Sequence, residues 1–224
     1  NTGVFFFEDL NLDPITVSFG SRLDVRTVEA VPNDRTTESD QLDNTYTTLS
    51  GAVGASYAFG DGVAIATNLS SGFRAPSVFE LYASGVHGGV AAFQQGNPDL
   101  EPERSYSADL SLRVRRDRVT AEVTGYVNAI QDYIYLENTD RERVVSNGDT
   151  LSVFVANQTE ALIPGIEATV ETSPLPWLKV GGSAAVLDGT GDGLGADEGD
   201  DGKLPLLPAN TVRGFVRWVP ADTG

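Results

Sequence analysis

The feature that most constrains the fold of this chain is the order of the connections between its stretches of alternating apolar and polar residues. Short turn-forming segments occur at residues 11–14, 60–62, 115–118, 173–177 and 220–224. Long polar segments occur between them, at residues 31–44, 75–102, 137–150 and 188–209. The two kinds of connection alternate without exception. Antiparallel neighbours joined in this order have all their short turns at one end and all their long loops at the other.

The stretches between these connections follow the two-residue period of a β-strand. Between residues 15 and 26 one face is apolar, and it carries Ile15, Val17, Phe19, Leu23 and Val25. Many stretches run for about 11 residues or more, roughly twice the usual strand length. Charged residues such as Arg22, Glu122 and Glu171 lie on the polar face. The sequence therefore predicts an all-β fold, an antiparallel, up-and-down transmembrane β-barrel segment of about nine strands.

One stretch, residues 151–172, changes the parity of its apolar face partway along. A β-bulge at Pro164-Gly165 would explain the change, because proline cannot donate to a ladder and a bulge redirects the side chains that follow. We interpret residues 1–224 as one partial β-barrel domain. Alternation alone also fits a soluble β-sandwich or propeller, but long strands with a charged polar face disfavour both.

Composition limits the possible functions of the chain. The 32 acidic residues outnumber the 15 basic ones, which gives a net charge of −17. This charge argues against a nucleic-acid binder, which needs a basic surface, and leaves cationic, metal-bearing or neutral partners. The absence of cysteine excludes disulfides and thiolate metal sites within this chain. With one histidine as well, no catalytic arrangement is evident, so we expect neither an enzyme nor a cofactor.

The most specific sequence signal is a pair of motifs about 20 residues apart, GFRAPSVFELY from Gly72 and GNPDLEPE from Gly96. Together with the following strand SYSADLSLRV, they resemble TonB-dependent outer-membrane receptors, in which one motif ends a strand and the other begins the next. The segment ALIPGIEATV is similar to another strand of that family. Pro76 should end strand pairing, and Asn97-Pro98 should shape the return to the sheet. We expect Arg74 and Glu103 to form an ion pair at the barrel rim.

The resemblance implies an outer-membrane location, a complete barrel of about 22 strands and a plug domain. Neither the plug nor the final strands are present in residues 1–224, and contact with TonB would be made through the missing N-terminal region. The expected function is that of wall and extracellular loops in a receptor importing a scarce nutrient, with a metal ion or metal complex favoured. Expected partners are outer-membrane lipid and a small ligand such as a siderophore, metal ion or cobalamin-like compound. The alternatives are a passive porin or adhesin barrel and a soluble carbohydrate-binding β domain.

Candidate ligand-binding residues lie in two of the long loops. The stretch LYASGVHGGVAAFQ resembles the zinc-uptake members of the family, whose corresponding loop often carries several histidines. In this chain the loop contains one histidine, His87, whereas a zinc site needs three or four ligands. A solvated loop residue is the alternative for His87. The other candidates are Glu80, Tyr82, Asp192, Asp197 and Glu198. The last three belong to a Gly/Asp-rich loop that would suit Ca²⁺ or remain solvated, and its charge argues against an anionic ferric siderophore.

Overall fold

The computed structural model describes residues 1–31, 43–87, 89, 91–145, 148–192, 194 and 202–219, and it is built almost entirely of strands. The elements are β1 (Thr2–Leu12), β2 (Ile15–Glu29), β3 (Asp43–Gly60), β4 (Val63–Arg74), α1 (Val78–Tyr82), β5 (Ser84–His87), β6 (Ala92–Gln95), β7 (Glu103–Arg116), β8 (Val119–Val144), β9 (Thr150–Leu175), β10 (Leu178–Leu187), β11 (Thr190–Gly191) and β12 (Thr211–Trp218). No helix in this described part is both long and apolar enough to cross a membrane.

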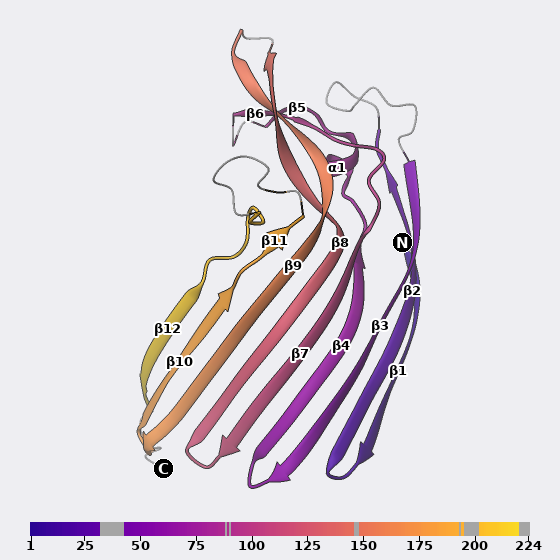
Figure 1. The fold of residues 1–224 in the computed structure, drawn as a ribbon. Coiled ribbons are helices and arrows are strands. Elements are labelled where there is room, and N and C mark those ends of the chain that lie inside the picture. The colour runs from indigo at the N-terminus through magenta and orange to yellow at the C-terminus, as the bar shows by residue number, and fades with distance from the viewer. Residues whose placement is uncertain are drawn as a thin grey trace.

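Nine of the strands form one continuous antiparallel path in the order β1-β2-β3-β4-β7-β8-β9-β10-β12, which confirms the predicted number. Figure 1 shows a single curved sheet with its tight turns at the lower end and its long connections at the upper end. The predicted sorting of turns and loops is therefore confirmed for the connections that the structure describes. The turn predicted at residues 220–224 lies outside the described residues.

The two faces of the sheet differ as the alternation predicts. Leu23 lies opposite Val4 on one side and Leu49 on the other, and all three side chains are exposed on the apolar face. The opposite face carries ion pairs such as Arg113 with Glu122. A soluble domain would bury its apolar face against a second layer, but Figure 1 shows one layer in the described part of the chain. The prediction of a barrel wall is confirmed, and the soluble alternative is not supported.

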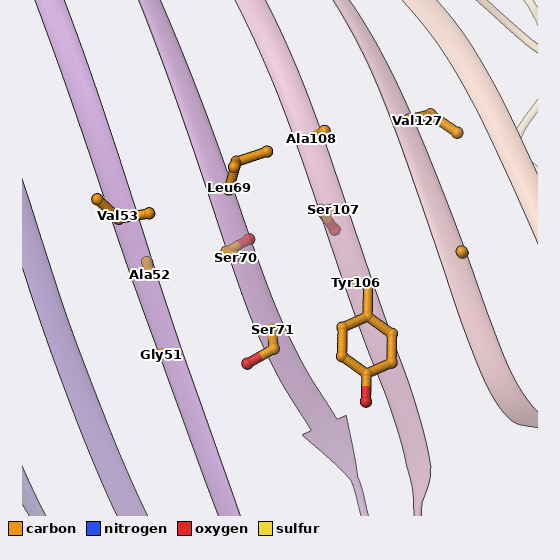
Figure 2. A pocket seen from close by; sticks show the side chains of 11 residues that line it. Gly51, Ala52, Val53, Leu69, Ser70, Ser71, Tyr106, Ser107, Ala108 and Val127 are labelled. Atoms are coloured by element: carbon orange, nitrogen blue, oxygen red, sulfur yellow. The ribbon is translucent and has the colours of Figure 1, made fainter.

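The apolar face is not smooth. A shallow groove of about 590 Å³ crosses it where small residues of adjacent strands lie side by side, with Gly51 opposite Ser71 on the neighbouring strand. Figure 2 shows Val53, Leu69 and other apolar residues along the groove. This groove lies on the apolar face of the wall, and none of its lining residues belongs to the candidate site described below.

Two predictions about the loops were wrong. Residues 137–150 were expected to be a polar loop, but β8 continues to Val144 and β9 starts at Thr150, so the two strands form a long hairpin. Cross-strand pairing in this hairpin, for example Glu137 with Val155, overrides its polar composition. Likewise, the segment 75–102 is not free of regular structure, because it contains α1, β5 and β6.

The predicted bulge was also misplaced. Pro164 lies opposite Val127 in unbroken register, just beyond the last β9–β10 pair, so its missing N–H interrupts no pairing on that side. The register instead shifts in β8 between Ile130 and Tyr133, where Asp132 has a φ of 56°. This β8 bulge redirects the strand at the level of the loops, next to the candidate site.

Candidate functional site

The segment 75–102 fills a gap in the upper wall. The β3–β4 register begins at Gly51, and the β7–β8 register ends at Gln131, so the upper parts of β3 and β8 have no β4 or β7 beside them. Figure 1 shows α1 at this level, and its Tyr82 contacts Asn44 of β3 and Ile134 of β8. We call residues 75–102 the loop module; it bridges strands that would otherwise be left apart.

A small apolar core attaches the loop module to the wall. Leu81 and Tyr82 of α1 pack with Leu100 against side chains from the wall, namely Val28, Ile134 and Ala156. Burying side chains of this size contributes about 1.5–3 kcal/mol each. Tyr82 is 1% exposed, and its hydroxyl accepts a hydrogen bond from Asn44 Nδ2 at 3.0 Å. Its side chain therefore serves the scaffold, and we do not carry Tyr82 forward as a ligand contact.

The start of α1 is fixed by a capping box between Ser77 and Glu80. Ser77 Oγ accepts from the Glu80 amide at 3.3 Å, and Glu80 Oε2 accepts from the Ser77 amide at 2.7 Å. This arrangement satisfies two amides that the first helical turn leaves without partners. Pro76 is fully buried just before the cap. Pro76 was expected to end strand pairing, and the last pair between β4 and β7 is indeed Arg74 with Glu103.

Arg74 joins the two motifs. It donates to both oxygens of Glu103 at 2.7 Å, which is the expected ion pair, and Arg74 Nη1 also donates to Glu80 Oε1 and Oε2 at 3.0 and 2.9 Å. Glu103 Oε1 accepts from the Ile134 amide at 2.8 Å, beside the β8 bulge. Burial alone would raise the pKa of the Glu80 carboxyl, but hydrogen bonds from Arg74 and Ser77 outweigh it and lower the pKa.

The second motif contacts α1 through its backbone. Gly96 donates to the Ala83 carbonyl at 2.7 Å, and Asn97 donates to the Glu80 carbonyl at 2.8 Å. A Cβ on Gly96 would lie 2.6 Å from the carbonyl carbon and oxygen of Leu81, so only glycine fits this approach. Pro98 follows in the turn, and its carbonyl accepts from Asn44 Nδ2 at 3.4 Å.

Sequence reasoning missed Gln158 of β9, which holds the end of the loop module. Its Oε1 accepts from the Glu101 amide at 3.0 Å, and its Nε2 donates to the carbonyls of Glu101 and Asp132 at 2.9 and 2.8 Å. The polar run Asn157-Gln158-Thr159 within a strand was the available signal. Its partners could not be inferred, because they depend on the β8 bulge.

Two adjoining cavities lie between the loop module, the β8–β9 hairpin and residues 205–206; together we call them the loop cavity. The larger, of about 440 Å³, is lined by His87, Ala92, Gln94, Tyr133, Ile134, Tyr135, Leu136, Phe154, Pro205 and Leu206. The smaller, of about 210 Å³, shares five of these residues and adds Phe79, Glu80, Ala83 and Gln95. Pockets for small organic ligands typically span about 300–1,000 Å³ and are mainly apolar.

Two large apolar side chains stand at the rim of the loop cavity. Leu206 is 98% exposed although it lines both parts, and its φ of 60° lies in the left-handed region. A non-glycine residue in this region costs about 1–2 kcal/mol. Phe79, on α1, is 79% exposed and lines the smaller part. Exposed apolar groups of this size beside a cavity are typical of binding surfaces.

Apart from the buried Tyr82, the predicted ligand residues divide into three groups. His87, at the end of β5, and Glu80, on α1, line the loop cavity. Asp192 lies elsewhere, in a turn whose backbone bonds to Glu160 and Thr159 of β9. Asp197 and Glu198 lie outside the described residues. Within the described part of the chain, no three His, Cys, Asp or Glu side chains are grouped closely enough to hold a metal ion.

Comparison with known proteins places this geometry in a family. The family model described as TonB dependent receptor-like, beta-barrel matches residues 1–224. The vitamin B12 transporter BtuB of Photobacterium profundum is 30% identical over 105 residues, which cover 47% of this chain and 15% of that protein.

Solved structures show the same fold. The copper transporter OprC superposes with a TM-score of 0.77 at 20% identity, over 98% of this chain and 33% of that one. The siderophore receptor PirA from Pseudomonas aeruginosa gives a TM-score of 0.62 at 18% identity, over 88% of this chain and 37% of that one. The chain thus spans about a third of these receptors. On the family match, the chain belongs to the TonB-dependent receptors, which are β-barrel proteins of the outer membrane.

Proposed function

We propose that the full-length protein is an energised outer-membrane importer of a metal ion or metal complex, and that the loops of this segment form part of its capture surface. The observation that carries the proposal is the family match over all 224 residues. Similar proteins are described as transporters of vitamin B12 and copper and as a siderophore receptor, each of which handles a metal or a metal complex.

Charge supports a cationic or neutral ligand. The two loops at residues 75–102 and 188–210 contain nine acidic residues and one basic residue. A negative entrance concentrates cations and repels anions, and the effect weakens as salt rises. The same charge disfavours an anionic ferric siderophore.

His87 is the residue we propose to contact the metal-bearing ligand. Its side chain is exposed and lines the larger part of the loop cavity. A neutral imidazole is a common metal ligand, although one imidazole does not complete a zinc site. Glu80 would act differently, because its carboxylate is held by Arg74 and Ser77 and so fixes α1 beneath the cavity.

Transport would require partners beyond these residues. In the proposal, a plug region closes the barrel lumen and TonB supplies energy through the N-terminal part of the whole protein. A passive porin would share the wall but would not depend on TonB, so this dependence separates the two functions.

The test uses a strain lacking the full-length gene, complemented with the wild-type gene, in backgrounds with and without TonB. Growth and uptake are measured under limitation for zinc, copper, iron and cobalamin in turn. We expect the deletion to abolish uptake of one of these nutrients, and we expect surface binding to persist without TonB while uptake is lost. Equal uptake with and without TonB would rule out the proposal in favour of a passive barrel.

A further inference from the structure

We infer that the groove on the apolar face of the wall, together with Arg104 just above it, binds a phosphate-bearing lipid of the outer leaflet. The phosphate meets the Arg104 guanidinium, and an acyl chain lies in the groove. Because the outer leaflet of this membrane is built mainly from an acylated sugar phosphate, lipid A, we assign the site to that lipid and not to a phospholipid. The inference depends on the outer-membrane location of the family and not on the nutrient that is imported.

Arg104 lies on the outward face of the wall. It is the second residue of β7, and strand alternation places its side chain on the same face as Tyr106 and Ala108. The register with β4 agrees, because Arg104 lies opposite Phe73 and Tyr106 lies opposite Ser71. The Arg104 side chain is exposed. It therefore faces the lipid, whereas the residues directly before and after it face the lumen.

The length of β7 sets the level of this arginine in the membrane. β7 has 14 residues, and at about 3.4 Å per residue with a tilt of about 40° it rises roughly 35 Å. The apolar band of an outer-membrane barrel is only about 25 Å tall, with aromatic residues at both edges. Along β7 the outward residues run from Arg104 and Tyr106 through apolar side chains to Arg116. Arg104 therefore lies at the headgroup level on the side of the long loops, which is the outer leaflet.

The charge of Arg104 is available to an anion. Within the part of the chain that the structure describes, its side chain takes part in none of the ion pairs, whereas Arg116 Nε donates to the Asp61 carbonyl at 3.1 Å. A guanidinium binds a phosphate through two parallel hydrogen bonds. Basic side chains at the headgroup level attract anionic lipids. Because the whole chain has a net charge of −17, such a lipid needs a local cation of this kind.

The groove provides space for an acyl chain below the headgroup. Ala108 lies in it between the larger side chains of Leu69 and Val127, and Tyr106 lines its upper part (Figure 2). Tyr106 is 48% exposed, and an amphipathic ring of this kind suits the boundary between acyl chains and headgroups. Since the surroundings are already apolar, the chain gains close contact with the groove walls and not release from water.

The experiment measures lipid binding to the purified full-length receptor in a neutral detergent by native mass spectrometry. The probes are lipid A, fully dephosphorylated lipid A, phosphatidylglycerol and phosphatidylcholine. We expect lipid A to bind most tightly, and its dephosphorylated form to bind about tenfold more weakly, because a charge-assisted pair is lost. Phosphatidylglycerol should bind more weakly than lipid A because it has fewer phosphates and acyl chains, and phosphatidylcholine should bind most weakly because it has no net charge.

Variants of the two outward arginines test the phosphate contact. Arg104→Gln should weaken lipid A binding about tenfold and should remove the difference between lipid A and its dephosphorylated form. Arg104→Lys keeps the charge and should retain most of the affinity. Arg116→Gln is the matched control, because Arg116 also faces outward but lies at the opposite end of β7. It should leave lipid A binding unchanged.

A second pair of variants tests the groove. Ala108→Leu fills the space beside Leu69 and Val127, and it should weaken binding of both forms of lipid A severalfold while preserving the difference between them. Ala121→Leu is the control, because Ala121 lies opposite the outward Val114 and does not line the groove. Both changes keep an apolar side chain on the lipid-facing wall, so neither should unfold the barrel.

The inference would be overturned if Arg104→Gln bound lipid A as tightly as the wild type, or if either dephosphorylated lipid A or phosphatidylglycerol bound as tightly as lipid A. It would also be overturned if the receptor were dimeric and Ala108→Leu made it monomeric, because the groove would then belong to a second copy of the chain. Failure of the proposed import has a different signature, namely TonB-independent uptake in cells.

Discussion

A glycine in the barrel wall and a glycine in the loop module differ in the space that surrounds them. A Cβ on Gly125, in the middle of β8, would meet no atom within 4 Å, whereas a Cβ on Gly96 would lie 2.6 Å from backbone atoms of Leu81 and Tyr82. The carboxylates of the two regions also differ, in their burial and in the number of groups they bind. Glu122 forms an exposed pair with Arg113, whereas Glu103 is buried and binds both Arg74 and the Ile134 amide.

This comparison shows that the two regions depend on sequence in different ways. In the wall, backbone ladders hold the strands together, and a lipid-facing position requires little more than an apolar side chain. In the loop module, regular pairing is short, so stability depends on particular contacts between α1, the second motif and β8. Matched substitutions should therefore have unequal effects, and hydrogen exchange in the loop module measures them directly as free energies of local opening.

The largest difference is expected between Gly96→Ala and Gly125→Ala. The methyl group at position 96 would push against the backbone of α1, which cannot yield as a side-chain tip can, and should destabilise the loop module by about 3 kcal/mol. Hydrogen exchange of residues 75–102 in the full-length receptor would report the loss. Gly125→Ala serves as the control and should leave exchange unchanged. Equal protection in the two variants would contradict the close approach of Gly96 to α1.

The next largest effect is expected from Glu103→Ala. It removes the bidentate partner of Arg74 and leaves the Ile134 amide without its acceptor, so we expect a loss of about 2 kcal/mol in loop-module stability. The matched change Glu122→Ala breaks an exposed pair and should cost less than about 0.5 kcal/mol. Exchange at the Ile134 amide is the most direct readout, and unaltered protection there would show that Glu103 does not anchor the β8 bulge.

The contrast between the regions also explains which features could be predicted from sequence. Wall strands were predictable because alternation is a local property, and each strand shows it within its own residues. The Arg74–Glu103 pair was predictable because two motifs fixed the strand ends on which these residues lie. The extension of β8 and β9 through residues 137–150 was missed because polar composition favoured a loop, while cross-strand pairing prevailed.

The loop cavity could not be predicted because it is assembled from distant segments. Gln158 contacts Glu101 across 57 positions, and the position of Gln158 depends on a bulge at Asp132 that the sequence did not indicate. His87 was predicted because it is the one histidine of the sequence, whereas no local pattern marks Leu206, which lines the same cavity. Tyr82, the last residue of the first motif, was predicted as a ligand contact, whereas the structure buries it.

A smaller effect is expected from pH through Glu80. Its pKa is lowered in the folded loop module, so the stabilisation is present above the usual pKa of glutamate and is lost as pH falls through the lowered value. Exchange of the α1 amides should therefore accelerate in acid. Glu80→Gln should cost about 1 kcal/mol at neutral pH and should remove this part of the acid dependence. An identical acid response in the variant would assign the effect to other groups.

The smallest difference is expected when one conservative change, leucine to isoleucine, is made in each region. Leu81 is fully buried in the core of the loop module, whereas Leu69 is 55% exposed on the membrane-facing side of β4. The branched side chain at position 81 must fit a fixed space on a short helix, and we expect a cost of about 0.5 kcal/mol. At position 69 lipid can adjust to the new shape, and a β-branched residue suits a strand, so exchange in β4 should not change. A larger effect at Leu69 than at Leu81 would mean that the membrane-facing wall also depends on specific side-chain packing.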